Sequence, residues 1–511
     1  MVKNPLLGER SFEVEIRVIA GDIAKTETGA IILGLFEGVK RPEGDLAVID
    51  EALAGAISQL ISQGEIKGKL REVTIIHSLG RLPGDRVVVL GLGKRDELTL
   101  DRVRTTAGEA CRLLQQREVS HVATVALGAG VVGIGLGDAA QAVTEGALLG
   151  SYSFRRHMTK EAEHGELKRL TIVGTDDELP LLQQGSDKGR VLAEATKLAR
   201  DMVNEPANYM TPSRMAETAA SLAKAYGLEL EVLEREQMQK LGMGALLGVT
   251  QGSRQPPKFI ILRYRGGNSA QIDLALIGKG ITFDSGGISI KPSEGMEEMK
   301  GDMAGGAAVM AAISAIAQLK LRFNVLAIIP CMENLPGGEA LKPGDVLTAM
   351  NGKTIEIITT DAEGRLTLAD ALSYANKLGA KCIVDVATLT GSCHIALGDD
   401  CSGVFGNNQE LVDRLITASA IAGELMWQLP LYEQAKEQLK SEVADTKNVG
   451  GKWGGAITAA HFLAEFAGNT PWVHLDIAGT SRSEKDRGYI VKGATGVTVC
   501  TLVNLALSLA K

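Results

Sequence analysis

The chain has 511 residues, of which 45% are hydrophobic and 23% are charged, and its formal net charge is −8. This composition is typical of a folded globular protein and excludes disorder of the whole chain. The length exceeds that of one ordinary hydrophobic core and predicts at least two domains. An acidic chain is also a poor candidate for a general binder of nucleic acid or of anionic membranes. Its 60 glycines and its aromatic content of only 4% favour α/β layering over a β-sandwich.

The cysteines and the N-terminal segment indicate a cytoplasmic protein. Six cysteines are spread along the chain without a CxxC pair, which predicts free thiols in a reducing compartment. The N-terminal segment lacks the apolar core of a signal peptide, and no uncharged apolar run reaches the roughly 18 residues of a membrane span. We therefore expect a cytoplasmic location and no membrane partner.

The first third of the chain alternates between strand and helix patterns. Strands are expected at 12–18, 30–36, 72–78, 86–93, 121–128 and 170–175. Helices are expected at 49–64, where Gly64 follows an amphipathic run, and at 101–117. This alternation predicts a small N-terminal α/β domain over residues 1–180.

A connecting helix region and a larger domain follow. The segment 176–187 is polar and contains Pro180, and a good helix pattern follows it at 190–205, so we expect a connecting helix region over residues 181–203. From residue 204 onward, apolar runs typical of strands buried on both faces occur at 274–280, 324–330, 382–389 and 472–479. Helices are expected beside them at 304–319, 366–378 and 456–467. Residues 204–511 are therefore expected to form a C-terminal α/β catalytic domain with a mixed central sheet flanked by helices.

Several short patterns resemble functional motifs and are better explained as ordinary structure. GAGVVG at 128–133 follows a strand, but no helix begins at its third glycine, so it predicts a turn and not a dinucleotide loop. The sequence DSGG at 284–287 resembles the nucleophile loop of serine proteases, but those enzymes are all-β and no general-base motif accompanies it. His394 and His474 are expected to be hydrogen-bonded structural residues, because the chain contains no HExxH.

Lys279 stands at the end of an apolar strand pattern, and Asp284 follows five residues later. A lysine in such a position needs a partner, because burial of an unpaired charge is costly. One explanation is an ion pair with a carboxylate. The other is a metal ion, to which a neutral lysine amine binds and which lowers the lysine pKa.

Further charges precede two predicted helices. Asp302 lies just before an apolar helix, where it could be a simple N-cap, and Lys291 lies in a loop upstream of it. Asp361, Glu363 and Arg365 crowd the start of the next helix, where they could form a surface capping cluster. Their flanks are apolar, however, and carboxylates clustered at a buried junction favour a hard divalent cation.

Together these segments supply one amine and four carboxylates, a donor set that could hold two divalent ions with shared bridging carboxylates. Two such ions activate water for hydrolysis. Lys291 and Arg365 would remain to stabilise an oxyanion or to hold an anion. Sequence spacing alone leaves structural ion pairing open as the alternative.

The chain resembles the leucyl aminopeptidases, the M17 family of di-metal exopeptidases. TTDAEGRL at 359–366 is similar to the family signature NTDAEGRL. The resemblance continues through NEPANYMTP (204–212), GKGITFDSGG (278–287), MENLPGGEALKPGDVLTAMNGKT (332–354), VATLTG (386–391), WVHLDIAGTS (472–481) and GATGVTVCTLV (493–503). It covers nearly all of residues 190–511 in the family's order, whereas residues 1–180 match only in general pattern.

The resemblance implies an enzyme that releases N-terminal amino acids, with a leucine-type preference, from peptides with a free N-terminus. It also implies that a water molecule activated by two metal ions carries out the hydrolysis. The implied ligands of the loosely bound ion are Asp284, Asp361 and Glu363. Those of the tightly bound ion are Lys279, Asp284, Asp302 and Glu363. The ions would be zinc, manganese or magnesium.

Further roles follow from the same resemblance. Lys291 matches the catalytic lysine, and Arg365 matches the arginine that holds a bicarbonate ion acting as general base. Met299, Thr388 and Gly391 fall where the family lines the pocket for the first side chain. Family members are typically homohexamers, so a homohexamer is expected here.

Two departures from the family pattern bear on the shape of the pocket. Thr359 replaces the usual asparagine of the signature, and Trp453 lies in the glycine-rich run GGKWGGA at 450–456, which is usually less aromatic. Neither departure removes a ligand. The competing hypotheses are another two-metal hydrolase, such as a phosphatase, and a non-enzymatic role in binding DNA or as a chaperone. The net charge and the lack of a Lys/Arg-rich block argue against nucleic acid.

Overall fold

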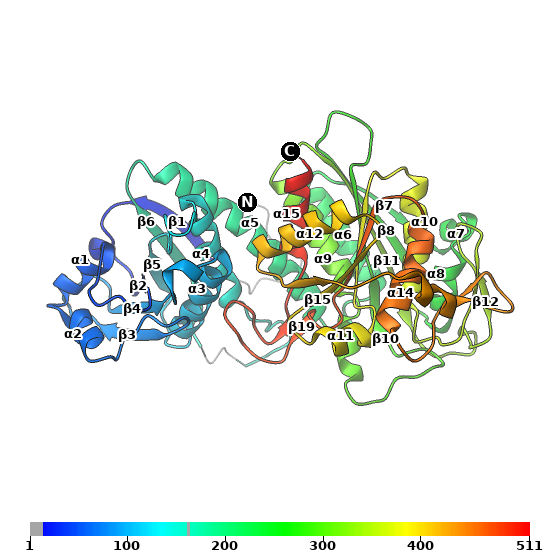
Figure 1. The fold of residues 1–511 in the computed structure, drawn as a ribbon, viewed down its shortest axis with the longest axis horizontal. Helices are drawn as coiled ribbons and strands as arrows, with labels where there is room; N and C mark the ends of the chain where they lie inside the picture. The colour runs from blue at the N-terminus through cyan, green and yellow to red at the C-terminus, as the bar shows by residue number, and fades with distance from the viewer. Residues whose placement is uncertain (1–13, 161–163, 511) are drawn as a thin grey trace. The chain divides into compact units, whose positions relative to one another are not determined.

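The computed structural model describes residues 14–160 and 164–510 and divides them into two compact units. One unit comprises the described residues up to Glu194 together with Glu484–Lys492, and the other comprises Ala195–Ser483 and the chain from Gly493 onward (Figure 1). The division at Glu194 falls inside the long helix α5 (Leu179–Asn204).

A mixed sheet organises the described part of the first unit, in the order β1-β6-β5-β2-β4-β3. Only the pair β3–β4 is antiparallel. The strands are β1 (Glu15–Ala20), β2 (Ala30–Leu35), β3 (Val73–His77), β4 (Arg86–Gly91), β5 (His121–Thr124) and β6 (Arg169–Gly174). The prediction of six strands is confirmed, although residues 12 and 13 of the first lie outside the described residues.

Helices cover both faces of this sheet, and their apolar side chains form two cores. Helices α3 (Leu100–Gln115) and α4 (Leu136–Gly150) pack with alternate strand residues on one face. Helices α1 (Asp45–Ala52) and α2 (Ala56–Ser62) cover the other face. Glycines let α3 and α4 approach closely, since a Cβ added to Gly146 would lie 2.3 Å from the carbonyl oxygen of Arg104.

The single helix predicted at 49–64 is wrong, because α1 and α2 are separate. Ala54 and Gly55 adopt positive φ angles of 57° and 81°, which interrupt the helix. The buried carboxylate of Asp50 then accepts hydrogen bonds from the backbone N–H groups of Ile57 and Ser58, at 2.8 and 3.0 Å. Asp50 thus caps the second helix from within the first, which the periodicity of apolar residues does not reveal.

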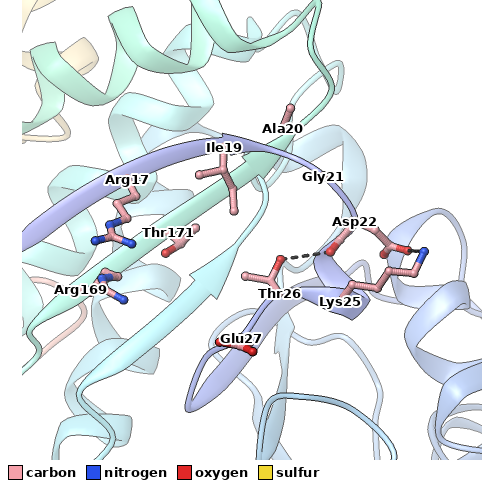
Figure 2. A pocket seen from close by; sticks show the side chains of 10 residues that line it. All are labelled: Arg17, Ile19, Ala20, Gly21, Asp22, Lys25, Thr26, Glu27, Arg169 and Thr171. Atoms are coloured by element: carbon pink, nitrogen blue, oxygen red, sulfur yellow. Dashed lines mark hydrogen bonds and ion pairs between the residues drawn. The ribbon is translucent and has the colours of Figure 1, made fainter.

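An open pocket of about 350 Å³ lies against β1 and β6 of the first unit (Figure 2). Its basic side chains Arg17 and Arg169 both pair with Glu15, at 2.6 and 2.7 Å. Asp22 pairs with Lys25 at the opposite end of the pocket. These three ion pairs are largely exposed, and ion pairs of this kind contribute little to stability.

A mixed nine-stranded sheet organises the described part of the second unit, in the order β16-β15-β18-β14-β9-β11-β8-β7, with β10 paired to β11. Its middle strands β18, β14, β9 and β11 are parallel. The strands are β7 (Glu229–Leu233), β8 (Lys258–Arg265), β9 (Leu274–Gly278), β10 (Gly280–Asp284), β11 (Asn324–Asn334), β14 (Ile383–Ala387), β15 (Ser402–Gly406), β16 (Met426–Gln428) and β18 (Trp472–Asp476). The predicted mixed sheet is therefore confirmed.

Helices flank this sheet on both faces (Figure 1). One layer consists of α8 (Gly244–Val249), α10 (Gly364–Lys377) and α14 (Gly455–Ala467). The other consists of α6 (Pro212–Tyr226), α9 (Ala304–Gln318), α12 (Gln409–Ala422) and α15 (Val499–Leu509). The predicted helices at 304–319, 366–378 and 456–467 correspond to α9, α10 and α14.

Short elements complete the second unit. They are the helices α7 (Arg235–Lys240), α11 (Gly391–Leu397) and α13 (Glu433–Lys436) and the strands β12 (Val346–Thr348), β13 (Thr354–Glu356), β17 (Thr446–Lys447), β19 (Arg482–Ser483) and β20 (Gly493–Ala494). No helix in the described residues combines the length and apolar character needed to cross a membrane.

Candidate metal centre

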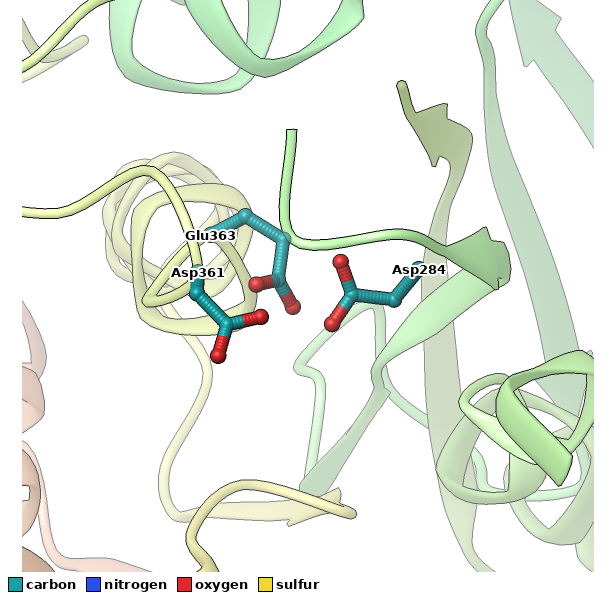
Figure 3. A group of neighbouring side chains, drawn as sticks. All are labelled: Asp284, Asp361 and Glu363. Atoms are coloured by element: carbon teal, nitrogen blue, oxygen red, sulfur yellow. The ribbon is translucent and has the colours of Figure 1, made fainter. Parts of the chain in front are cut away.

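Three carboxylates converge where β10 ends and α10 begins. Asp284 is the last residue of β10, and Asp361 and Glu363 precede α10. Each offers an oxygen that lies within 4.8 Å of those of the other two, and Figure 3 shows the three carboxylates pointing toward one space. Because this position lies at the carboxyl ends of parallel strands, it is where α/β sheets usually place their active sites.

Lys279 brings a buried amine to the same place. Its Nζ lies 2.8 Å from Oδ2 of Asp302 and 2.8 Å from Oε1 of Glu363. The same amine donates to the carbonyl oxygen of Thr388 at 3.0 Å. Burial lowers the pKa of Lys279, but the surrounding carboxylates raise it by more, so the net pKa lies above its ordinary value.

Lys291 approaches the carboxylates from the loop after β10. Its Nζ lies 2.8 Å from Oδ2 of Asp284 and 2.5 Å from Oδ1 of Asp361. Burial lowers the pKa of Lys291, but the charge of Asp284 and the hydrogen bonds to both carboxylates raise it above its ordinary value. The structure therefore places Lys291 directly beside the acidic cluster, in surroundings that favour its charged form.

Asp302 belongs to this centre and does not cap α9. The N-cap position of α9 is Met303, which makes no side-chain capping bond, so the alternative of a simple N-cap is wrong. A short 3-10 helix, Met296–Gly301, ends at Asp302 and directs its carboxylate toward Lys279. Its Oδ1 accepts a hydrogen bond of 2.7 Å from Oγ1 of Thr388.

Arg365 lies inside the first turn of α10, and its side chain is buried. Its Nη1 donates to the carbonyl oxygen of Asn448 at 2.7 Å. Among the residues that the structure describes, its Nε has no hydrogen-bond partner. Burial lowers the pKa of Arg365 to about 10, against the opposing charges of Glu363 and Asp476. Because Glu363 and Arg365 are almost fully buried, the alternative of a surface capping cluster is wrong for this pair.

The three predicted pocket residues lie in different surroundings. Thr388 directly follows β14 and touches Asp302, so it borders the centre. Met299 lies half-buried in the 3-10 helix that ends at Asp302. Gly391 begins α11 and is exposed.

Two residues that no sequence pattern singles out hold the loops of the centre together. The amide of Asn334, at the end of β11, donates to Oδ1 of Asp284 at 2.8 Å and to the carbonyl oxygen of Thr360 at 3.0 Å. Oγ1 of Thr360 donates to the carbonyl oxygen of Gly286 at 2.6 Å and accepts from the backbone N–H of Ser289 at 2.8 Å. The only advance signal for these residues is their position inside the conspicuous motifs.

Glycines allow Lys279 and Asp361 to lie close to the neighbouring backbone of the centre. A Cβ added to Gly364 would lie 2.7 Å from Cε and 2.8 Å from Nζ of Lys279. Gly286 has a φ angle of 86°, and a Cβ there would lie 3.0 Å from Oδ1 of Asp361. Both positions therefore exclude a side chain for reasons of space, and Gly286 also requires the left-handed backbone conformation.

The charges of the centre fit divalent cations. Burial and the nearby Glu363 raise the pKa of Asp284, and burial also raises that of Asp302 and of Asp361. Oδ2 of Asp302 is in an ion pair with Nζ of Lys279 at 2.8 Å. Three buried carboxylates and the more exposed Asp361 are the hard donor set that divalent ions prefer.

His394 and His474 are hydrogen-bonded to carboxylates, as expected for structural residues. Nδ1 of His474 lies 2.6 Å from Oδ1 of the buried Asp385, whose Oδ2 accepts a hydrogen bond from Nε1 of Trp472. His394 pairs with Asp399 at 2.5 Å. The six cysteines are free thiols, as the sequence predicts.

Comparison with known proteins assigns the family. A sequence model of the catalytic domain of the cytosol aminopeptidase family matches residues 197–503, and one of its N-terminal domain matches residues 32–161. The chain belongs to this family. A probable cytosol aminopeptidase of Alkaliphilus metalliredigens is 46% identical over 98% of this chain and 100% of its own length. Another, of Solibacter usitatus, is 47% identical over 97% and 99% of the two chains.

Solved structures agree with the family assignment. A variant of tomato leucine aminopeptidase superposes with a TM-score of 0.88 at 33% identity, over 98% of both chains. The bottromycin maturation enzyme BotP, in complex with Mn, superposes with a TM-score of 0.83 at 33% identity, over 95% of this chain and 100% of that one.

Membership of the family establishes the chemistry in outline. The chain is a metal-dependent aminopeptidase, a hydrolase that acts on peptides, which confirms the expectation from the sequence motifs. The hypothesis of a phosphatase is therefore wrong. The names of the relatives also agree with the expected cytoplasmic location.

Proposed function

We propose that this aminopeptidase binds two divalent ions per subunit and releases N-terminal residues, with a leucine-type preference, from peptides with a free N-terminus. The convergence of Asp284, Asp361 and Glu363 within 4.8 Å carries the proposal, and these residues would hold the more loosely bound ion. Lys279, Asp284, Asp302 and Glu363 would hold the tightly bound one. Asp284 and Glu363 would then bridge the two ions.

The ions would activate water and polarise the scissile carbonyl. The contacts of 2.8 Å from Lys279 to Asp302 and Glu363 support its place in this ligand set, because the ligands of one ion must lie side by side. These carboxylates favour the charged amine, so binding of the ion would have to release the proton from Lys279. The manganese named with BotP makes Mn²⁺ a reasonable first choice, and Zn²⁺ and Mg²⁺ are the other candidates. A carboxylate-rich site with one amine suits all three ions.

Lys291 and Arg365 would act on the substrate. Lys291, charged and beside both Asp284 and Asp361, would donate to the carbonyl oxygen of the scissile bond as negative charge develops on it. Arg365 would hold a bicarbonate ion, the expected general base. The Nε of Arg365, which has no hydrogen-bond partner among the described residues, is a donor that this anion could satisfy.

The first side chain of the substrate would contact Met299, Thr388 and Gly391. Thr388 supports this because it borders Asp302, and Met299 lies in the turn that leads to Asp302. A half-buried methionine and a threonine would together form a moderately apolar wall, which suits leucine. We further propose that the enzyme assembles as a homohexamer, as the family pattern implies, and that it binds neither nucleic acid nor membrane.

Metal analysis of two matched variants tests the ligand assignment. Asp361→Ala removes a ligand of the loosely bound ion alone, and we expect the purified variant to retain close to one ion per chain. Asp302→Ala removes a ligand of the tightly bound ion and should lower the affinity of that site. The wild-type protein should bind two Mn²⁺ ions per chain in equilibrium dialysis. One ion per chain in the wild type, or two in both variants, would contradict the proposal.

A further inference from the structure

The segment 388–391, at the junction of β14 and α11, carries two of the three proposed contacts for the first side chain of the substrate. One edge of this segment touches the metal centre. The carbonyl oxygen of Thr388 accepts a hydrogen bond from Nζ of Lys279 at 3.0 Å, and Oγ1 of Thr388 donates to Oδ1 of Asp302 at 2.7 Å. Thr388 is only half-buried and Gly391 is exposed, so burial alone does not fix the position of the segment.

Asp476 holds the other edge of the segment. It is the last residue of β18, which pairs with β14, and it is almost fully buried. Its Oδ1 accepts hydrogen bonds from the backbone N–H groups of Leu389 at 3.2 Å and Thr390 at 3.4 Å, and its Oδ2 accepts from Oγ1 of Thr390 at 2.7 Å. The same Oδ1 accepts from the backbone N–H of Ala478 at 3.2 Å, which ties the carboxylate to the end of its own strand.

Thr390 connects this anchor to α11. Its Oγ1, which donates to Asp476, also accepts a hydrogen bond of 3.0 Å from the backbone N–H of Cys393 and thereby caps the N-terminus of α11. One carboxylate therefore fixes the backbone from Leu389 to the start of the helix, where Gly391 lies.

The chemistry of this buried position indicates that the hydrogen bonds are needed. Burial of a carboxylate is costly unless hydrogen bonds compensate for the lost water. Three of the four hydrogen bonds named above come from the segment 388–391. An apolar side chain would fill the same space without that cost, but it would leave two buried or half-buried backbone N–H groups without an acceptor.

We propose that Asp476 is a positioning residue for substrate specificity. It holds the segment 388–391 against the metal centre, so that Thr388 and Gly391 form a firm wall for a leucine side chain. Asp476 acts through the segment and does not touch the substrate. The inference rests on the proposed function, because it uses the assignment of Thr388 and Gly391 to the first side chain.

Two substrates that differ only in the first side chain provide the test. The metal-loaded wild type and Asp476→Ala are assayed with the p-nitroanilides of leucine and of alanine, and kcat and KM are measured for each. One methylene group in an apolar pocket changes kcat/KM by about tenfold or more, so a loosened wall should lower the ratio of kcat/KM for leucine over alanine by roughly tenfold. The loss should appear mainly as a higher KM for the leucine substrate. Asp476→Asn keeps an oxygen that accepts from both backbone N–H groups and should retain most of the ratio.

Asp385 provides a matched control, because it is a buried aspartate on the neighbouring strand β14 whose carboxylate binds His474 and Trp472. Asp385→Ala should leave the ratio unchanged even where less of the protein folds, since a smaller amount of active enzyme lowers the apparent kcat equally on both substrates. The negative charge of Asp476 also acts on Arg365. A loss of activity by that route is again equal on both substrates and cancels in the ratio.

An unchanged ratio in Asp476→Ala would overturn the inference, and an equal fall in kcat on both substrates would then identify Asp476 as an anchor for folding alone. Should Asp476→Ala fail to fold, Thr390→Val removes the hydroxyl that joins Asp476 to α11, and Thr390→Ser keeps it. Only Thr390→Val should then lower the ratio, and equal ratios in the two variants would overturn the inference. A metal-loaded wild type that cleaves both substrates equally would contradict the proposed leucine preference itself, and the inference with it.

Discussion

At the scale of single residues, Lys279 owes its position to a glycine. Its amine reaches Asp302 and Glu363 only because Gly364, at the start of α10, has no side chain. The sequence predicts that Lys279 needs a partner, since a buried lysine is costly. The sequence does not show that the side chain of Lys279 lies across the first turn of α10, 85 residues later. That contact between Lys279 and Gly364 depends on the pairing of β9 with β14.

Gly364→Ala should therefore disturb the metal centre while leaving the fold intact. The new methyl group would stand 2.7 Å from Cε of Lys279 and displace its amine, and we expect metal affinity to fall about tenfold or more, as for other residues that orient a ligand. Isothermal titration with Mn²⁺ measures this directly. Gly338→Ala is the control, since a Cβ there meets nothing within 4 Å. Equal affinities in the two variants would contradict this account of Lys279.

Sequence patterns indicate the charged residues of the centre but not the polar residues that hold its loops together. Asp361, Glu363 and Arg365 could be recognised because charged residues interrupt apolar flanks. Asn334 and Thr360 could not, because a polar residue at the end of a strand or in a loop is ordinary. Their importance arises only when β11 brings Asn334 to Asp284 across 50 residues of sequence.

At the scale of elements, the buried carboxylate of Asp370 ties three segments together. It projects from α10 and accepts hydrogen bonds from the backbone N–H of Leu246 in α8 and of Met350 after β12, both at 2.8 Å. Burial raises the pKa of Asp370 to about 7, against the opposing effect of these hydrogen bonds. The helix α10 therefore carries the metal ligands at its start and a structural carboxylate two turns later.

This carboxylate predicts a specific dependence of stability on pH. Because its pKa in the folded protein lies above the ordinary value of 3.8, the folded state binds the proton more tightly than the unfolded chain. Its stabilising effect is present near pH 4 and is lost as the pH rises to 7. Asp370→Asn removes this effect, so the Tm of the variant relative to that of the wild type should increase over this range.

Differential scanning calorimetry at several pH values measures the difference. Ser373→Ala is the control, because it lies on the same helix and removes only a hydrogen bond to the carbonyl oxygen of Ala369. The Tm of this control relative to the wild type should stay constant with pH. A constant difference for Asp370→Asn as well would show that Asp370 does not change its protonation between pH 4 and 7.

Elements with strong periodicity were predictable, and their ends were less so. The apolar runs at 274–280 and 472–479 became β9 and β18 because strands buried on both faces are uniformly apolar. The pattern at 49–64 forms two helices, because Ala54 and Gly55 have positive φ angles and Asp50 caps the second helix. Hydrophobic periodicity does not reveal either feature. Likewise, α5 begins at Leu179, earlier than the predicted helix at 190–205, since Pro180 is compatible with a first helical turn.

At the scale of the whole molecule, the two units differ in how many recognisable family motifs their sequences contain. The long motifs that resemble the family all lie in the second unit, which holds the metal centre. Sequence inspection of the first unit shows only a general α/β pattern, although the model of the family's N-terminal domain matches residues 32–161. The first unit also includes Glu484–Lys492, which Arg112 contacts through a hydrogen bond to the carbonyl oxygen of Gly488. No local sequence pattern predicts that the chain comes back to this unit 376 residues later.

The central claim is that the acidic centre makes this chain a metal-dependent exopeptidase that requires a free N-terminus. Hydrolysis of leucine p-nitroanilide tests it most directly. The purified protein is assayed after chelation, after reloading with Mn²⁺ or Zn²⁺, and beside the N-acetylated substrate. We predict activity that disappears on chelation, returns with the metal and is absent on the acetylated compound. Equal cleavage of the two substrates, or none with metal bound, would contradict the account.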